Sequence, residues 1–413
     1  MWRNYLKIAW KVLLRRKFFT FVSLFAIGFT LSVLLATTTL LDHFFGPHPP
    51  DIRSDRTLGI FWSQFKGPRS TWNGGGIGYG FLDRYARGIP GVEVFSICTA
   101  GPRPADSFIN GIKVKSDLRH TDGAFWQIMS FTFLEGSPYT SQDDRMANPV
   151  AVINQRTREL FFGKEPAFGK FITVDGRRFR VVGVVPNVSR IRLMAYGDIW
   201  VPIGTAKSDG FRRELMGEYH GYFLASRIDD FPRIKDEFDS RLKRVVFPDP
   251  QQYNQLSCSL QTISEAVASR DGLGQGAGTI GLVVMIFFLM VLFMFLPVVN
   301  LVNLNISRIL ERCSEIGVRK AFGASSRTLI GQFVVENILL TLIGSLLGIL
   351  GAILILRFIT QSALIPYAQF QLNWRIFLYG LALTFFFGLF SGIYPAWRMS
   401  RLQPVQAIKG GLS

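Results

Sequence analysis

The most regularly spaced charged side chains in this sequence lie in one short stretch, ERCSEIGVRK, at residues 311–320. Apolar residues recur at helical spacing from Ile306 onward, and charged residues occupy the opposite face. Glu315 and Arg319 stand four positions apart, which favours an ion pair along a helix. The chemistry offered by this pattern is ionic recognition: the helix either lies on lipid headgroups or presents fixed charges to a partner protein.

The sequence offers little for catalysis. It contains no G-x-x-x-x-G-K-[ST] phosphate loop and no G-x-S-x-G nucleophile motif. The four histidines, which show no metal-ligand spacing, are His43, His48, His120 and His220. Two Gly-rich runs, GGGIGYG at 74–80 and GLGQGA at 272–277, are predicted to be flexible linkers. We therefore expect a protein that is not an enzyme, with no catalytic, cofactor-binding or metal-binding residue in this chain.

Membrane spans must position the charged stretch. The chain has 413 residues, of which 48% are hydrophobic and 18% charged, which is too apolar for an ordinary soluble protein. Four segments of about 20 residues carry no charge, namely 18–41, 279–299, 338–356 and 376–394. The first is too long for a secretory signal core and is followed by no small-residue cleavage site. We expect an α-helical membrane protein with four transmembrane helices.

Basic residues set the orientation. Lys and Arg are concentrated in the N-terminal segment, in the loop 303–332 and in the tail, whereas the connection 360–374 has none. Both termini and the loop 303–332 are therefore predicted to be cytoplasmic, and the large segment 43–276 external. The expected organisation is an amphipathic helix at 1–17, helix 1 at 18–41, the external domain at 43–276, helix 2 at 279–299, a coupling elbow at 303–332, helix 3 at 333–358, helix 4 at 376–394 and a tail at 395–413.

The net charge of +17 does not indicate a nucleic-acid partner. The segment 43–276 holds 30 basic and 25 acidic residues, so most of the excess belongs to the membrane-side segments. Residues 2–17 place basic residues at intervals of four among Trp and Leu, which predicts an interfacial helix on the lipid bilayer. A Cys98–Cys258 disulfide is chemically permitted in an external domain, and the sequence leaves it open.

The external segment is predicted to be mixed α/β, inserted between helices 1 and 2. Residues 148–154 form a short apolar strand, and a helix follows with Asn154 as its cap and Gly163 as its terminator. Asp175-Gly176, with alternating apolar residues behind it, predicts a β-hairpin over 170–185.

Two regions of the sequence resemble a known family. TDGAFWQIMSFTFLEGSPYTSQDD at 121–144, followed by VAVINQRTRELFFGKEPAFGKFITVDGRRFRVVGVV, is similar in order to the extracytoplasmic core domain of MacB-type permeases. ERCSEIGVRKAFGASSRTLIGQFVVEN, together with YPAWRMSRLQPVQAIKG at 394–410, resembles the signatures of FtsX/MacB-type permeases. The departures are small: Cys313 replaces a small or polar residue, and Lys409 stands where Arg is commoner.

The resemblance implies a type VII ABC transporter permease, a four-span subunit that dimerises with a second copy or a paralogue. It implies a separate cytoplasmic ABC ATPase that holds the ATP and Mg, so that this chain itself has no cofactor. The residues expected to contact that ATPase are Glu311, Arg312, Glu315, Arg319 and Lys320. Gly344, Gly348 and Ala352 permit close helix approach, either at a dimer interface or within the subunit. Glu336 is expected near the membrane interface.

The resemblance further implies that ATP hydrolysis inside the cell moves the external domain, a mechanotransmission that drives efflux or envelope transport at the bacterial inner membrane. Two alternatives share the architecture. One is an FtsX-like scaffold that regulates a cell-wall hydrolase, and the other is a Lol-like lipoprotein-releasing permease. A periplasmic adaptor would accompany the efflux function, and a lipoprotein partner the Lol-like one.

Overall fold

The computed structural model describes residues 2–15, 17–109, 112–206, 210–270 and 326–362, with scattered positions between 288 and 386. It divides into two units. The helical unit comprises Met1–Asp42, Val283–Ser362 and Gln369–Ser413, and the sheet unit comprises His43–Leu282 and Ala363–Ala368. Residues 303–325 of the predicted elbow 303–332 lie outside the described residues, as do the predicted tail 395–413 and most positions of the predicted helices 2 and 4.

Within the described residues, the helical unit contains the helices α1 (Trp2–Arg15), α2 (Lys17–Phe45) and α11 (Ser326–Gln361). In the described part of the chain, the segments Lys17–His43 and Val334–Gln361 are long and apolar enough to cross a membrane. They carry the first and third predicted spans. Exposed phenylalanines at four-residue intervals, Phe21, Phe25 and Phe29, form one face of α2, as expected where a helix meets lipid.

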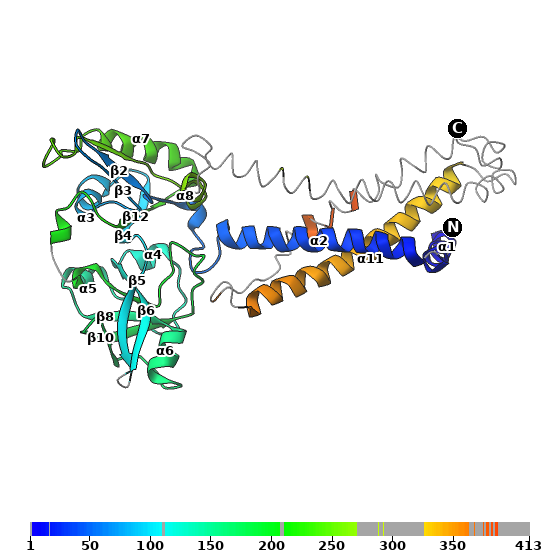
Figure 1. The fold of residues 1–413 in the computed structure, drawn as a ribbon, viewed down its shortest axis with the longest axis horizontal. Coiled ribbons are helices and arrows are strands. Elements are labelled where there is room, and N and C mark those ends of the chain that lie inside the picture. The colour runs from blue at the N-terminus through cyan, green and yellow to red at the C-terminus, as the bar shows by residue number, and fades with distance from the viewer. Residues whose placement is uncertain are drawn as a thin grey trace. The chain divides into compact units, whose positions relative to one another are not determined.

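The sheet unit is mixed α/β, as the sequence predicts (Figure 1). Its strands are β1 (Thr57–Gly59), β2 (Ser63–Lys66), β3 (Thr71–Gly74), β4 (Val92–Thr99), β5 (Arg103–Ile109), β6 (Ile112–Thr121), β7 (Glu135–Gly136), β8 (Val150–Asn154), β9 (Phe171–Val174), β10 (Arg177–Val185), β11 (Ile199–Pro202), β12 (Tyr219–Ala225) and β13 (Gln255–Cys258). Its helices are α3 (Tyr79–Phe81), α4 (Phe125–Ile128), α5 (Ser141–Arg145), α6 (Gln155–Phe162), α7 (Phe231–Leu242) and α8 (Ile263–Arg270).

The main sheet closes on itself at one end. Its strand order is β1-β12-β4-β6-β11-β8-β10-β9-β5, and β5 also pairs with β6. The six strands from β6 to β5 therefore form a ring of pairings, which we call the barrel. Inward side chains from all six strands make its core. They include Ala105, Leu118, Ala151, Ile153, Ile172, Val181 and Ile199. A closed barrel leaves fewer sheet edges exposed than an open sheet.

Local sequence signals place several barrel elements correctly. The hairpin of β9 and β10 turns at Asp175 and Gly176, which both have positive φ (49° and 76°) as a type I′ turn requires. Asn154 caps α6 by accepting a hydrogen bond from the Thr157 N–H at 2.8 Å, and Gly163 ends the helix with φ 62°. The predicted strand, helix and hairpin are confirmed.

The Gly-rich run at 74–80 is not a flexible linker, so that prediction was wrong. Its middle is buried, and Ile77 pairs with Tyr219 through two backbone hydrogen bonds. A Cβ atom at Gly78 would lie 2.2 Å from the carbonyl oxygen of Glu214, so glycine is required by close backbone approach. The second run, 272–277, lies outside the described residues. Cys98 and Cys258 are separate buried thiols, with no disulfide between them.

Candidate functional site

The predicted coupling residues lie outside the described residues. These are Glu311, Arg312, Glu315, Arg319 and Lys320. Their role at an ATPase contact therefore stays a prediction. Helix α11 begins at Ser326, directly after the Gly-Ala-Ser break of the sequence.

The small residues of α11 lie against α2 of the same chain. A Cβ atom at Gly344 would lie 2.6 Å from Cγ2 of Ile27, and one at Gly348 would lie 2.7 Å from Cβ of Leu31. Ala352 is fully buried in the cluster that contains Leu31. In the described part of the chain these three residues therefore pack within the subunit, and a dimer interface at this face stays a prediction.

A hydrogen bond that the sequence analysis missed joins the same two helices. The Ser32 hydroxyl lies 2.7 Å from the carbonyl oxygen of Gly28 and 3.0 Å from that of Gly348, so it can donate along α2 or across to α11. The crossing has no side chain at Gly348 to hold the backbones apart, which is why the hydroxyl can reach a helix carbonyl. Ser32 carries no sequence signal for this role, because serine is common in spans.

Polar side chains continue along the buried face of α11. Gln332 and Glu336 are one turn apart, and 7% and 5% of their surfaces are exposed. The helix α1 packs against α11 in the same unit. A carboxyl group at the start of a span is costly in lipid, and burial within protein is the usual way in which it is accommodated.

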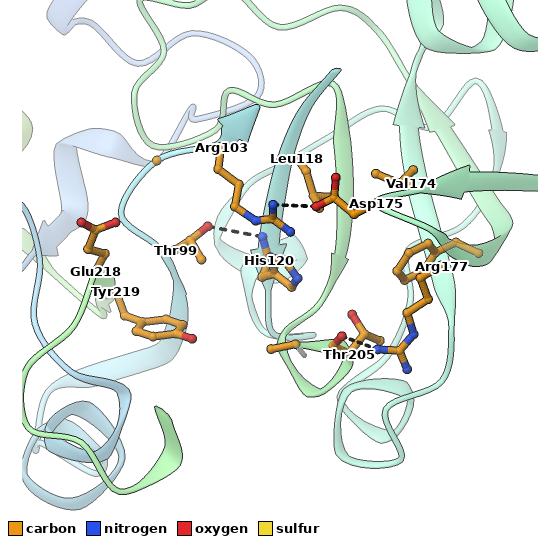
Figure 2. A pocket seen from close by; sticks show the side chains of 13 residues that line it. Thr99, Arg103, Leu118, His120, Val174, Asp175, Arg177, Thr205, Glu218 and Tyr219 are labelled. Atoms are coloured by element: carbon orange, nitrogen blue, oxygen red, sulfur yellow. Dashed lines mark hydrogen bonds and ion pairs between the residues drawn. The ribbon is translucent and has the colours of Figure 1, made fainter. Parts of the chain in front are cut away.

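A cleft of about 470 Å³ opens at one end of the barrel (Figure 2). The lining residues are Thr99, Gly101, Arg103, Leu118, His120, Val174, Asp175, Arg177, Phe179, Thr205, Ala206, Glu218 and Tyr219. Leu118, Val174 and Phe179 belong to the barrel core, so the core supplies the apolar wall. The polar side chains come from the start of β5, the end of β6 and the β9–β10 hairpin, elements that are far apart in the sequence.

The cleft holds an ordered set of charges. The Arg103 guanidinium lies 2.6 Å from a carboxylate oxygen of Asp175, and the other oxygen of Asp175 accepts the Asp106 N–H at 2.8 Å. Arg177 donates to the carbonyl oxygen of Thr205 and stacks beside Phe179. Asp175, Arg177 and His120 all line the cleft, and Figure 2 shows Asp175 extending toward Arg103 and Arg177 toward Thr205.

His120 is neutral in this environment. Burial, together with the positive charges of Arg103 and Arg177, lowers the pKa of His120 to about 4, against a smaller opposing effect of Asp175. Its imidazole makes no hydrogen bond within the part of the chain that the structure describes. The sequence could not single out His120, because its neighbours in the cleft come from other strands.

This shift predicts how acid destabilises the sheet unit. An unfolded histidine binds a proton below pH 6.5, whereas His120 in the folded protein does so only near pH 4, so stability is lost as the pH falls from 6.5 to 4. Between pH 6.5 and 4 we expect the free energy of unfolding of His120→Gln to fall by about 2 kcal/mol less than that of the wild type. This figure allows for the partial exposure of the His120 side chain. Urea unfolding of the solubilised chain, followed by tryptophan fluorescence at several pH values, measures the difference.

A second buried group, Asp122, changes the stability of the sheet unit in the opposite direction as the pH falls. Burial raises the pKa of Asp122 to about 6, in spite of hydrogen bonds from Ile97, Ser96 and Phe125, so its contribution to stability grows as the pH falls. Because that effect is common to both proteins, it cancels in the difference between wild type and His120→Gln. Parallel pH profiles for the two proteins would contradict the lowered pKa of His120.

Two family models match this chain in succession. The model for the MacB-like periplasmic core domain matches residues 20–238, and the model for the FtsX-like permease C-terminal region matches residues 287–404. The first match alone covers more than half of the chain. The second includes the predicted coupling stretch.

Individual relatives agree with these matches. The uncharacterized ABC transporter permease YknZ of Bacillus subtilis is 23% identical over 78% of this chain and 77% of its own length. The macrolide export ATP-binding/permease protein MacB of Photorhabdus laumondii is 28% identical over 72% of this chain, and that of Pasteurella multocida is 24% identical over 71%. The matched regions span only 44% and 43% of these two MacB proteins.

A solved structure of the periplasmic region of MacB from Actinobacillus actinomycetemcomitans is 14% identical, with a TM-score of 0.38, and covers 53% of this chain and 94% of that one. The family assignment rests on the sequence matches, which join a core domain and a permease region in one chain. The chain belongs to the FtsX/MacB family of ABC transporter permeases.

Proposed function

We propose that this chain is the non-catalytic permease subunit of an ABC transporter, which couples ATP hydrolysis by a separate cytoplasmic ATPase to motion of its external domain. The observation that carries the proposal is the succession of the two family matches, 20–238 and 287–404, on one chain. The absence of a phosphate-loop motif from the sequence supports a separate site for ATP and Mg.

The helix pair supports a mechanical role. At Gly344 and Gly348 the helices α2 and α11 lie so close that even an added Cβ atom would clash. Helices packed in this way shift as units rather than deforming continuously. Helix α2 runs without interruption from Lys17 to Phe45, directly before the sheet unit in the sequence. A displacement at the cytoplasmic ends of these helices would therefore be carried along their length.

The proposed setting is the bacterial inner membrane, with both termini cytoplasmic and the sheet unit periplasmic. The proposed partners are an ABC ATPase, a second permease copy or paralogue, and a periplasmic adaptor or lipoprotein. The proposal includes no nucleic-acid partner. The relatives named for macrolide export favour efflux or envelope transport over hydrolase regulation or lipoprotein release.

Reversing the predicted coupling charges should release the ATPase. We expect Glu315→Lys with Arg319→Glu to lower recovery of the ATPase at least about tenfold when the tagged chain is purified from its native membrane, because each partner charge then faces a like charge. Quantitative mass spectrometry of the co-purified proteins measures the loss.

A matched control lies in the sheet unit. Asp83 and Arg87 form an exposed ion pair at the same four-residue spacing, 3.0 Å apart, so Asp83→Arg with Arg87→Asp makes an equivalent reversal there. This control should retain the ATPase. Recovery of no ATPase with the wild-type chain, or equal losses from both variants, would count against the proposed coupling.

A further inference from the structure

The cleft at the end of the barrel has the size and walls of a small-molecule site. Its volume is about 470 Å³, within the range of roughly 300–1,000 Å³ typical of ligand pockets. Leu118, Val174 and Phe179 supply an apolar wall, and Tyr219 adds an aromatic ring. Such sites combine an apolar lining with a few polar groups that orient the ligand.

The polar groups of the cleft favour an anion. Asp175 is already engaged by Arg103 and by the Asp106 N–H. Arg177 is different: within the described chain its guanidinium makes one hydrogen bond, to the Thr205 carbonyl oxygen. A guanidinium has five N–H donors, and the Arg177 side chain is exposed, so most of its donors remain available to a ligand.

His120 reports the sign of the electrostatic potential inside the cleft. The arginines Arg103 and Arg177 both disfavour a proton on its imidazole, and Asp175 offsets them only in part. Glu218, the other carboxylate of the lining, is not among the groups that shift His120. The potential at His120 is therefore positive, while the ring itself is neutral and able to donate or accept a hydrogen bond.

We propose that this cleft binds an amphiphilic carboxylate, a small molecule whose anionic end is held by Arg177 and His120 and whose apolar body packs on Leu118, Val174 and Phe179. Arg177 presents the paired donors that match a carboxylate, and the barrel core presents the apolar surface. The Arg103–Asp175 ion pair keeps Arg103 in place along one side. This site is independent of the proposed ATPase coupling, because it lies wholly in the sheet unit.

Three probes with one body and different end groups test the charge preference. The full chain in lipid nanodiscs is titrated calorimetrically at pH 7.5 with 4-phenylbutyrate, 4-phenylbutan-1-ol and 4-phenylbutylamine, with empty nanodiscs as the blank. We expect the carboxylate to bind at least about tenfold more tightly than the alcohol or the amine. Equal binding of the three probes, or no binding of the carboxylate, would overturn the proposal.

Two neighbouring arginines provide matched variants. Successive side chains of β10 point to opposite faces, and Arg178 lies over the Phe171 ring, 4.0 Å from its centre, rather than in the cleft. We expect Arg177→Gln to weaken 4-phenylbutyrate binding about tenfold and Arg178→Gln to leave it unchanged, although each removes one positive charge. Equal weakening by both would show a diffuse charge effect and refute the assigned site.

A third variant fills the cleft without altering its charges. Ala206 lines the cleft and is partly exposed, so Ala206→Trp should abolish binding of the carboxylate. Retained binding in this variant would place the ligand elsewhere and refute the proposal. Near-ultraviolet circular dichroism checks that each variant is folded, and the comparison of three probes on the wild-type chain decides the charge preference even where a variant fails to fold.

Discussion

Replacing Gly348 with isoleucine is expected to separate α2 from α11. The new Cβ atom would lie 2.7 Å from Cβ of Leu31 and 3.0 Å from its Cγ, distances that real side chains do not tolerate. The Ser32 hydroxyl would also lose its close approach to the Gly348 carbonyl oxygen. Overpacking of this kind costs about 1–3 kcal/mol, which corresponds to a change of roughly fivefold or more in the population of the packed pair.

Disulfide trapping measures the separation. Leu34 and Ile349 pack against the same small cluster between the two helices, so cysteines at these positions should cross-link in the parent chain and much less with Gly348→Ile. Gly331, on the same helix, is the matched control, because a Cβ atom there would meet nothing within 4 Å. Unchanged cross-linking with Gly348→Ile, or an equal loss with Gly331→Ile, would show that close packing at Gly348 does not hold the pair.

Gly348 also shows what the sequence could predict of the helical unit. The spacing of small residues predicted close approach at this face, because only small side chains permit it. The spacing could not say which helix approaches, since Ile27 and Leu31 are ordinary apolar residues of a span. The partner follows from the three-dimensional arrangement.

In the sheet unit, too, some features could be predicted from the sequence and others could not. The hairpin at Asp175 and Gly176 and the cap at Asn154 are fixed by residues next to one another, so the sequence predicts them. The closure of the barrel depends on pairing between β5 and β9, two strands that lie far apart in the sequence, and no local pattern encodes that pairing. The cleft depends on that closure, and for this reason His120 and Arg177 could not be recognised as neighbours.

The glycine run at 74–80 shows how a local interpretation fails. Glycines without a phosphate-loop pattern usually indicate flexibility, yet Gly78 is required by a backbone that passes beside Glu214 and Leu215. Those residues lie more than 130 positions away in the sequence. A glycine chosen for close approach and one chosen for freedom look identical until the neighbouring chain is placed.

Replacing Arg119 with methionine is expected to destabilise the sheet unit by about 3–5 kcal/mol. Arg119 is fully buried. Its Nη1 donates to the carbonyl oxygens of Leu193 and Tyr196, at 3.1 and 3.2 Å, and its Nη2 donates to the Thr99 carbonyl and the Tyr222 hydroxyl, at 3.3 and 3.1 Å. Methionine fills the space without donating, so these buried acceptors lose their partners at a cost of about 1–3 kcal/mol each, offset by relief of the buried charge.

Lysine at position 119 separates the charge from the hydrogen bonds. Arg119→Lys keeps the positive charge but has three donors on one nitrogen, which cannot reach carbonyls on both sides, so an intermediate loss is expected. Urea unfolding followed by tryptophan fluorescence reports the losses, because Trp126 and Trp200 lie in the neighbouring core. The exposed Arg178 is the control, and Arg178→Met should change stability little. If Arg119→Met were as stable as the wild type, the cost of burying the cation would equal the stabilisation from its hydrogen bonds. Arg119 would then not be the residue that holds the segment Leu193–Tyr196 against the sheet.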